Sequence, residues 1–127
     1  MELLAPHVAG FSVSSLFEAK LARRVLDCKG SVHMTTPGLR KEEMPELAGL
    51  CDHISFNSLS QWKALFPLVQ GRPACGLRVN PQLALVEDAR YNPCRKHSKL
   101  GVPLSALGTT LTDEPGLLEG LTGLHFH

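Results

Sequence analysis

Short runs of alternating apolar and polar residues recur along the chain at a nearly constant interval. The first four begin at residues 10, 31, 53 and 76, and a fifth begins at residue 123. Alternation with a period of two over such short runs is typical of β-strands. We therefore predict strands near residues 10–14, 31–35, 53–57, 76–80 and 123–127.

Signals for the start of a helix follow the first of these runs. Ser15 and Glu18 have the spacing of a capping box, in which the serine hydroxyl and the glutamate carboxylate each satisfy a free backbone amide. Phe17, Leu21 and Val25 then repeat on one helical face. This pattern predicts a helix directly after the first strand, with Glu18 as its capping acid.

The capping device recurs at Ser58 and Gln61, after the third run. It precedes Trp62 and Leu65, which share a helical face, and Pro67 should close this helix after about two turns. Core packing is the simplest role for Trp62.

Two further segments lie between or after these units. Residues 39–50 carry apolar side chains at three-residue spacing and predict a short helix, which tolerates Pro45 only near its start.

Residues 81–110 contain several prolines and glycines and predict a long connection rather than a simple crossover helix. A connection of that length is usually functional, so we treat it as a candidate site. Residues 115–121 predict one short helix before the last strand.

Strands that alternate with helices at these intervals indicate βα units and a parallel sheet, so the predicted fold class is α/β. A complete (β/α)₈ barrel takes about 200 to 250 residues. With 127 residues the chain has room for only part of one. We therefore predict a partial barrel, with an open edge at each end of its sheet.

Composition excludes several classes of protein. The chain is 43% hydrophobic and 20% charged with a net charge of +1, which is typical of a globular domain and unlike a disordered tail. No long block of basic residues points to nucleic acid as a partner. No apolar run is long enough to span a membrane, and the first residues lack the basic start of a signal peptide. We expect a cytoplasmic protein with small-molecule or protein partners.

The four cysteines do not form a metal site by their spacing. None of them makes the close pair that a structural zinc site needs. We expect reduced thiols packed as small apolar side chains, with Cys51 and Cys75 fitting best. Cys94 stands between a proline and basic residues and is expected to be exposed.

Five ordered motifs resemble the carboxynorspermidine (carboxyspermidine) decarboxylase family. That family belongs with the fold-type III, alanine-racemase-like enzymes that use pyridoxal 5'-phosphate. The matching strings are SSLFEAKL at 14–21, ISFNSLSQ at 54–61, GLRVNP at 76–81, YNPC at 91–94 leading to SKLGV at 98–102, and GLHFH at 123–127.

The resemblance implies a fold and a set of roles. Residues 1–127 would supply about the second to sixth strands of the cofactor-binding barrel, without the first strand or the C-terminal β-domain. His127 matches the histidine that stacks on the cofactor ring, Arg78 an arginine of the cofactor surroundings, and Ser12 a position near the cofactor. Lys99 occupies a basic position close to the barrel mouth. All four follow or end predicted strands, where barrel enzymes build their sites.

The same resemblance implies what the chain lacks. The lysine that attaches pyridoxal phosphate covalently would lie on the missing first strand, and neither Lys20 nor Lys29 can replace it. We therefore expect no catalytic residue and no decarboxylase activity in this chain alone. The parent enzyme would be a homodimer that acts on a carboxylated polyamine.

Two alternatives remain open. The chain could be a non-catalytic relic or a regulatory binding protein related to the decarboxylases, because a fold does not establish a function. His125 and His127 also form an H-x-H pair on one strand face, as in some metal-dependent hydrolases, although no other metal ligands are apparent. His33 is expected to be structural.

Overall fold

The computed structural model describes residues 1–27, 29–83, 92–95 and 97–126. The strands are β1 (Gly10–Val13), β2 (Ser31–Thr35), β3 (His53–Phe56), β4 (Ala74–Asn80), β5 (Val102–Pro103) and β6 (Leu121–His125). The α-helices are α1 (Leu16–Leu26), α2 (Met44–Leu50), α3 (Leu59–Leu65) and α4 (Leu104–Asp113). Short 3₁₀ turns cover Ala5–His7, Lys41–Glu43, Phe66–Leu68 and Pro115–Leu118.

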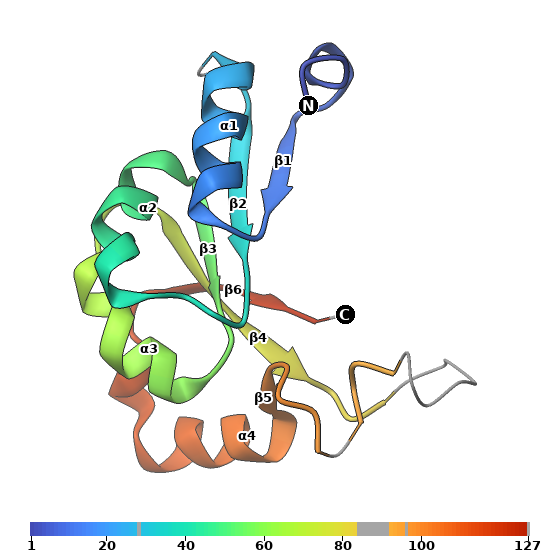
Figure 1. Cartoon of the computed structure of the whole chain (residues 1–127). Helices are drawn as coiled ribbons and strands as arrows, with labels where there is room; N and C mark the ends of the chain where they lie inside the picture. The colour runs from blue at the N-terminus through green and yellow to red at the C-terminus, as the bar shows by residue number, and fades with distance from the viewer. Residues whose placement is uncertain (28, 84–91, 96, 127) are drawn as a thin grey trace.

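All the strands run parallel, and the long ones follow one another in chain order. β1 pairs with β2, β2 with β3 and β3 with β4, and the other edge of β4 pairs with β6. The short β5 pairs only with the last two residues of β4. The sheet curves as it progresses, with β1 and β6 at its two edges (Figure 1). The predicted parallel α/β fold and partial barrel are confirmed.

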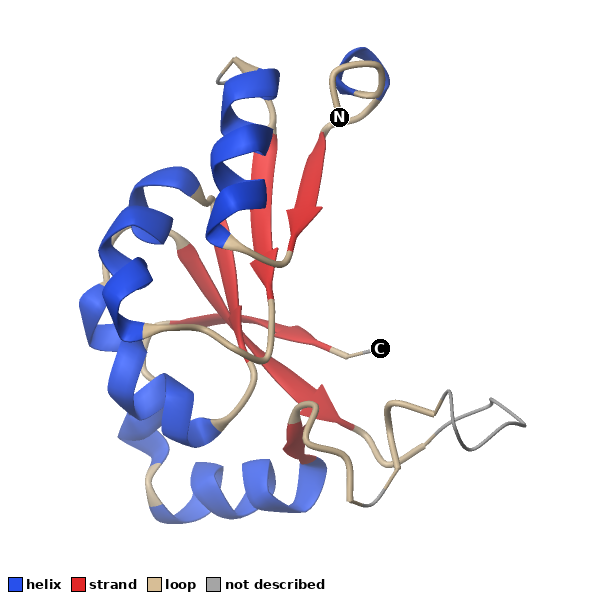
Figure 2. Ribbon diagram, in the orientation of Figure 1, coloured by secondary structure: helices blue, strands red, loops and turns tan. Residues whose placement is uncertain are grey.

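The α-helices cover one face of this curved sheet and leave the other face open (Figure 2). Alternation along the strands explains the arrangement, because successive side chains point to opposite faces. The helix-covered face is apolar and supplies most of the core. Its fully or nearly buried strand residues are Val13, Val32, Met34, Ile54, Phe56, Cys75, Leu77 and Val79.

The open face carries small and polar side chains instead. Register places Ser12 beside His33, His33 beside His53, and Arg78 beside His125. No helix of the described residues lies over this face of the sheet (Figure 2). The open face is therefore where chemistry could be built.

Both predicted capping serines are confirmed. The hydroxyl of Ser15 accepts a hydrogen bond from the amide of Glu18 (3.2 Å), and that of Ser58 accepts one from Gln61 (3.1 Å). In a usual capping box the acidic or amide side chain accepts a hydrogen bond from the amide of the capping serine itself, but here it accepts from the residue before that serine. The Glu18 carboxylate accepts from the amide of Ser14, and the Gln61 amide oxygen accepts from that of Asn57.

The apolar face expected for α1 is not its buried face. Phe17 is 75% exposed, whereas Ala19 and Ala22 are fully buried against the sheet. The small alanine side chains let the helix lie close to the strands, so Phe17 and Leu21 project past the contact. Lys20 lies on the solvent side of α1 and pairs with Glu46 at 2.8 Å.

The segment after β4 also differs from the prediction. The expected connection over 81–110 is shorter, because β5 and the first part of α4 lie within it. The expected helix over 115–121 is only the turn Pro115–Leu118, and β6 already begins at Leu121. Residues 84–91 lie outside the described residues.

Cys94 is buried rather than exposed, with 6% of its surface accessible. Its backbone amide donates to the side chain of Asn92 at 2.8 Å, and this tight turn folds the thiol inward. Cys51 and Cys75 are buried, as predicted. No helix in the described part of the chain has the length and apolar character needed to cross a membrane.

Candidate functional site

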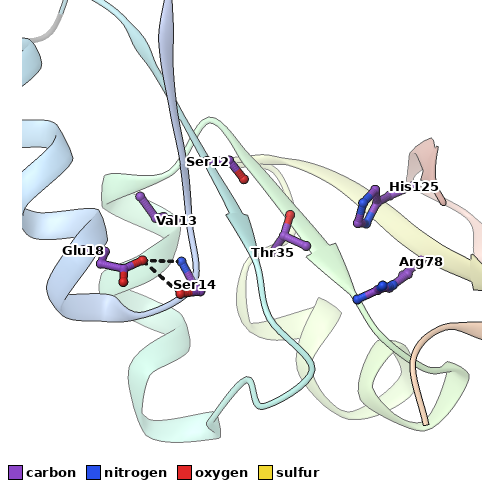
Figure 3. A pocket seen from close by; sticks show the side chains of 7 residues that line it. All are labelled: Ser12, Val13, Ser14, Glu18, Thr35, Arg78 and His125. Atoms are coloured by element: carbon purple, nitrogen blue, oxygen red, sulfur yellow. Dashed lines mark hydrogen bonds between the residues drawn. The ribbon is translucent and has the colours of Figure 1, made fainter. Parts of the chain in front are cut away.

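A pocket of about 310 Å³ lies on the open face, at the carboxyl ends of the strands. Figure 3 shows Ser12 and Thr35 facing Arg78 and His125 across this space. The carboxyl ends of parallel strands are the edge at which barrel enzymes place their reactive groups. We call it the strand-end pocket, and its lining residues are Ser12, Val13, Ser14, Glu18, Thr35, Arg78 and His125.

The β1–α1 turn forms one wall of the strand-end pocket. The carboxylate of Glu18 accepts from the amide of Ser14 at 2.7 Å and from its hydroxyl at 3.0 Å, as the dashed lines in Figure 3 show. These bonds hold the carboxylate at the N-terminus of α1, where the helix dipole favours negative charge. Glu18 therefore closes the turn and also contributes a fixed negative charge to the pocket.

Arg78 forms the opposite wall and is held by the chain that crosses over it. Gly101, at φ +86°, packs so closely there that a Cβ atom would lie 3.2 Å from Cγ of Arg78 and 2.9 Å from the backbone of Val79. Glycine suits this position both for its positive φ and for the lack of space. Gly101 therefore packs on the aliphatic part of the Arg78 side chain, and that side chain lines the pocket.

Three histidines lie on the open face near the strand-end pocket. The rings of His33 and His53 stack with their centres 5.6 Å apart. His53 lies across Gly76, where a Cβ would come within 2.9 Å of the imidazole. Burial, and then the charges of His33 and His125, lower the pKa of His53. His53 therefore favours the neutral imidazole near pH 7.

The structure brings together only some of the residues that the sequence singled out. Ser12 and Arg78 line the same pocket. Lys99 is exposed and lines a different pocket, which shares no residue with the first. His127 lies outside the described residues. The roles given to these four residues stay predictions.

Of the seven lining residues, the sequence singled out only Ser12 and Arg78 as cofactor contacts and did not place the other five in this pocket. His125 was treated only as half of a possible metal pair, and Thr35 was not considered. Glu18 was assigned only to the helix cap. Register was the missing information, because parallel pairing sets Arg78 beside His125. Within the described residues, no group of three or more His, Cys, Asp or Glu side chains is arranged to hold a metal ion.

Solved structures with the same arrangement of strands and helices are decarboxylases. One is carboxynorspermidine decarboxylase from Campylobacter jejuni complexed with norspermidine, with a TM-score of 0.73 and 30% identity over 99% of this chain and 29% of that chain. Another is diaminopimelate decarboxylase from Helicobacter pylori, also at 0.73, with 22% identity over 99% of this chain and 33% of that one. The second likeness concerns the fold alone. The chain thus has the fold of one part of a fold-type III decarboxylase barrel.

Curated relatives narrow this class. The chain is 33% identical over 127 residues to carboxynorspermidine/carboxyspermidine decarboxylase of Campylobacter jejuni, covering 100% of this chain and 31% of the relative. It is 36% identical over 121 residues to carboxyaminopropylagmatine decarboxylase of Synechocystis sp., covering 94% and 29%. No family model matches the chain. The chain spans about a third of the length of the two relatives. Their identity to it confirms its resemblance to the carboxynorspermidine/carboxyspermidine decarboxylases.

Proposed function

We propose that this chain forms part of the active site of a pyridoxal-phosphate-dependent decarboxylase acting on carboxynorspermidine or carboxyspermidine. The observation that carries the proposal is the convergence of Ser12, Thr35, Arg78 and His125 at the carboxyl ends of parallel strands. Similarity over the whole chain to a decarboxylase of this substrate class supports it. The Synechocystis relative is named for another carboxylated amine, which supports the same class.

The residues of the strand-end pocket fit the periphery of pyridoxal phosphate. Arg78 offers a planar cation for a phosphate or carboxylate, and Ser12 and Thr35 offer hydroxyls. Below them on the open face, Ser55 is 3% exposed and its hydroxyl has no hydrogen-bond partner among the described residues. A polar group bound nearby would satisfy such a hydroxyl. No lysine lines the pocket, so covalent attachment of the cofactor would need a residue that these side chains do not supply.

Each proposed contact has a separate task. Pyridoxal phosphate, when bound, accepts the electron pair left behind as carbon dioxide departs from the amino acid. His127 would stack on the ring and fix its orientation, while Arg78 would bind an anionic oxygen at its edge. Ser12 would donate a hydrogen bond to the same group. Lys99, at the barrel mouth, would add positive charge from outside the strand-end pocket.

The decisive variants are His127→Ala and His125→Ala. They are best made in a chimera in which this chain replaces the matching third of the Campylobacter jejuni decarboxylase, so that the remaining parts of the barrel are present. His127→Ala should weaken cofactor binding and decarboxylation together, because stacking orients the ring for bond cleavage. His125→Ala should do less. Unchanged cofactor affinity and activity in His127→Ala would refute the stacking role.

The isolated 127-residue chain should behave differently from the chimera. We expect it to form no borohydride-reducible adduct with pyridoxal phosphate and to release no carbon dioxide from carboxynorspermidine. A chimera that folds and binds the cofactor without decarboxylating would favour the regulatory alternative. The resemblance also supports a cytoplasmic location and a homodimeric parent enzyme. Sedimentation of the chimera can test the homodimer.

A further inference from the structure

A second pocket, of about 370 Å³, lies in the loop that follows β4. It is separate from the strand-end pocket, and three of its seven lining side chains are basic. Of the described residues, no acidic side chain lines it. We call it the basic-loop pocket, and its lining residues are Asn92, Pro93, Arg95, His97, Ser98, Lys99 and Leu100.

Two buried asparagines hold the backbone of the basic-loop pocket. Asn80, 2% exposed at the end of β4, donates from Nδ2 to the carbonyl of Arg95 at 3.2 Å. Asn57, 8% exposed just after β3, donates from Nδ2 to the carbonyl of Lys99 at 2.8 Å and accepts from the amide of Gly101 at 3.0 Å. The two carbonyls that are held in this way belong to the two permanently charged residues of the pocket.

No ion pair among the described residues neutralises these basic side chains. The ion pairs of the described residues are Lys20–Glu46, Arg23–Asp52, Arg40–Glu43 and Lys63–Glu114. None of them includes Arg95 or Lys99. Two cations fixed at one loop repel each other, and a bound anion removes that repulsion. Because the asparagines have already ordered the backbone, less conformational entropy is lost on binding.

We propose that the basic-loop pocket binds a phosphate group. Arg95 and Lys99 both line the pocket and offer charged donors, and several donors suit the several oxygens of a phosphate better than the single edge of a carboxylate. The inference does not depend on the proposed decarboxylase activity.

Isothermal titration of the chimera described under Proposed function, loaded with pyridoxal phosphate, with inorganic phosphate at constant ionic strength tests the proposal. We expect saturable binding that Arg95→Gln and Lys99→Gln each weaken about tenfold, since each removes one charge-assisted contact. Arg72→Gln is the matched control, because Arg72 is an exposed arginine that lies before β4, at the opposite end of that strand. This variant should bind phosphate as the parent does.

Competition then identifies the source of the phosphate. If pyridoxal phosphate displaces inorganic phosphate and pyridoxal does not, the ligand is the cofactor's ester. If inorganic phosphate binds and pyridoxal phosphate fails to displace it, the ligand is a free phosphate or another phosphate ester. Either result supports the proposal that the basic-loop pocket binds a phosphate group. The absence of saturable binding, or equal weakening by Arg72→Gln and Arg95→Gln, would overturn it, whatever the outcome of the decarboxylase assays.

Discussion

Replacing Trp62 by phenylalanine tests the packing of the helix-covered face. Trp62 lies in α3 with 1% of its surface exposed. Its ring stacks on Phe66 at 4.2 Å with an interplanar angle of 9°, and it meets Phe56 edge-on at 5.3 Å. Its Nε1 donates to the carbonyl of Leu117 at 2.7 Å, which ties α3 to the turn before β6.

The expected loss of stability follows from these contacts. Phenylalanine keeps one aromatic ring but leaves the Leu117 carbonyl without its donor, at a cost of about 1 to 3 kcal/mol. The missing part of the indole leaves a cavity that adds to this, although by less than full truncation of a buried Trp, which costs about 3 to 5 kcal/mol. We expect the free energy of unfolding to fall by about 2 to 4 kcal/mol. Phe17→Ala should change it by less than about 0.5 kcal/mol, because Phe17 is 75% exposed.

Urea unfolding of the chimera described under Proposed function, followed by far-ultraviolet circular dichroism, measures both variants. Tryptophan fluorescence is unsuitable, because Trp62 is the chain's one tryptophan. All samples need one protein concentration, since self-association makes the midpoint depend on concentration. A Trp62→Phe variant as stable as the parent would refute the packing argument. A Phe17→Ala variant that loses as much as Trp62→Phe would refute the assignment of the buried face of α1.

Three further predictions concern acid stability and thiols, both measured in the chimera, and association of the 127-residue chain alone. Burial alone would raise the pKa of Asp52, but hydrogen bonds from the Val32 amide and Arg23 lower it overall. The ionised carboxylate therefore stabilises the fold at pH values above the ordinary aspartate pKa of about 4, and this stabilisation is lost as the pH falls further. In Asp52→Asn, the urea midpoint should therefore depend less on pH in the acid range. Burial raises the pKa of Cys51 and of Cys75 to about 11. Both thiols should therefore resist iodoacetamide at pH 8 until urea unfolds the chain. Rapid labelling in native buffer, measured by peptide mass spectrometry, would contradict this. β1 and β6 each have one unpaired edge and the sheet has an open face, so the 127-residue chain should be oligomeric, molten or insoluble, and a cooperatively unfolding monomer in sedimentation and calorimetry would disprove this.

The sequence was sufficient for five of the six described strands and for their direction. Period-two runs located β1, β2 and β3 closely, and the regular interval between them required parallel crossovers. Ser15 and Ser58 marked two helix starts because capping is a local interaction between neighbours in the chain. Such features depend on residues close in sequence, so the sequence contains them.

Features that depend on tertiary contact were harder to predict. The face of α1 that packs on the sheet is set by Ala19 and Ala22, whose size allows close approach, and a search for large apolar residues selects Phe17 instead. The neighbourhood of Arg78 and His125 depends on β6 pairing directly with β4, which a spacing of 47 residues between predicted strands does not reveal. The asparagine contacts to Arg95 and Lys99 likewise link residues up to 42 positions apart.

Carbon dioxide release from carboxynorspermidine by the chimera with the Campylobacter jejuni decarboxylase tests the central claim most directly. The chimera should release carbon dioxide in the presence of pyridoxal phosphate, and Arg78→Ala should lower kcat/KM by at least about tenfold by removing a charge-assisted contact. Arg72→Ala, at the other end of β4, should leave it unchanged. A folded, cofactor-loaded chimera that releases no carbon dioxide, or an Arg78→Ala variant with unaltered kcat/KM, would contradict the account.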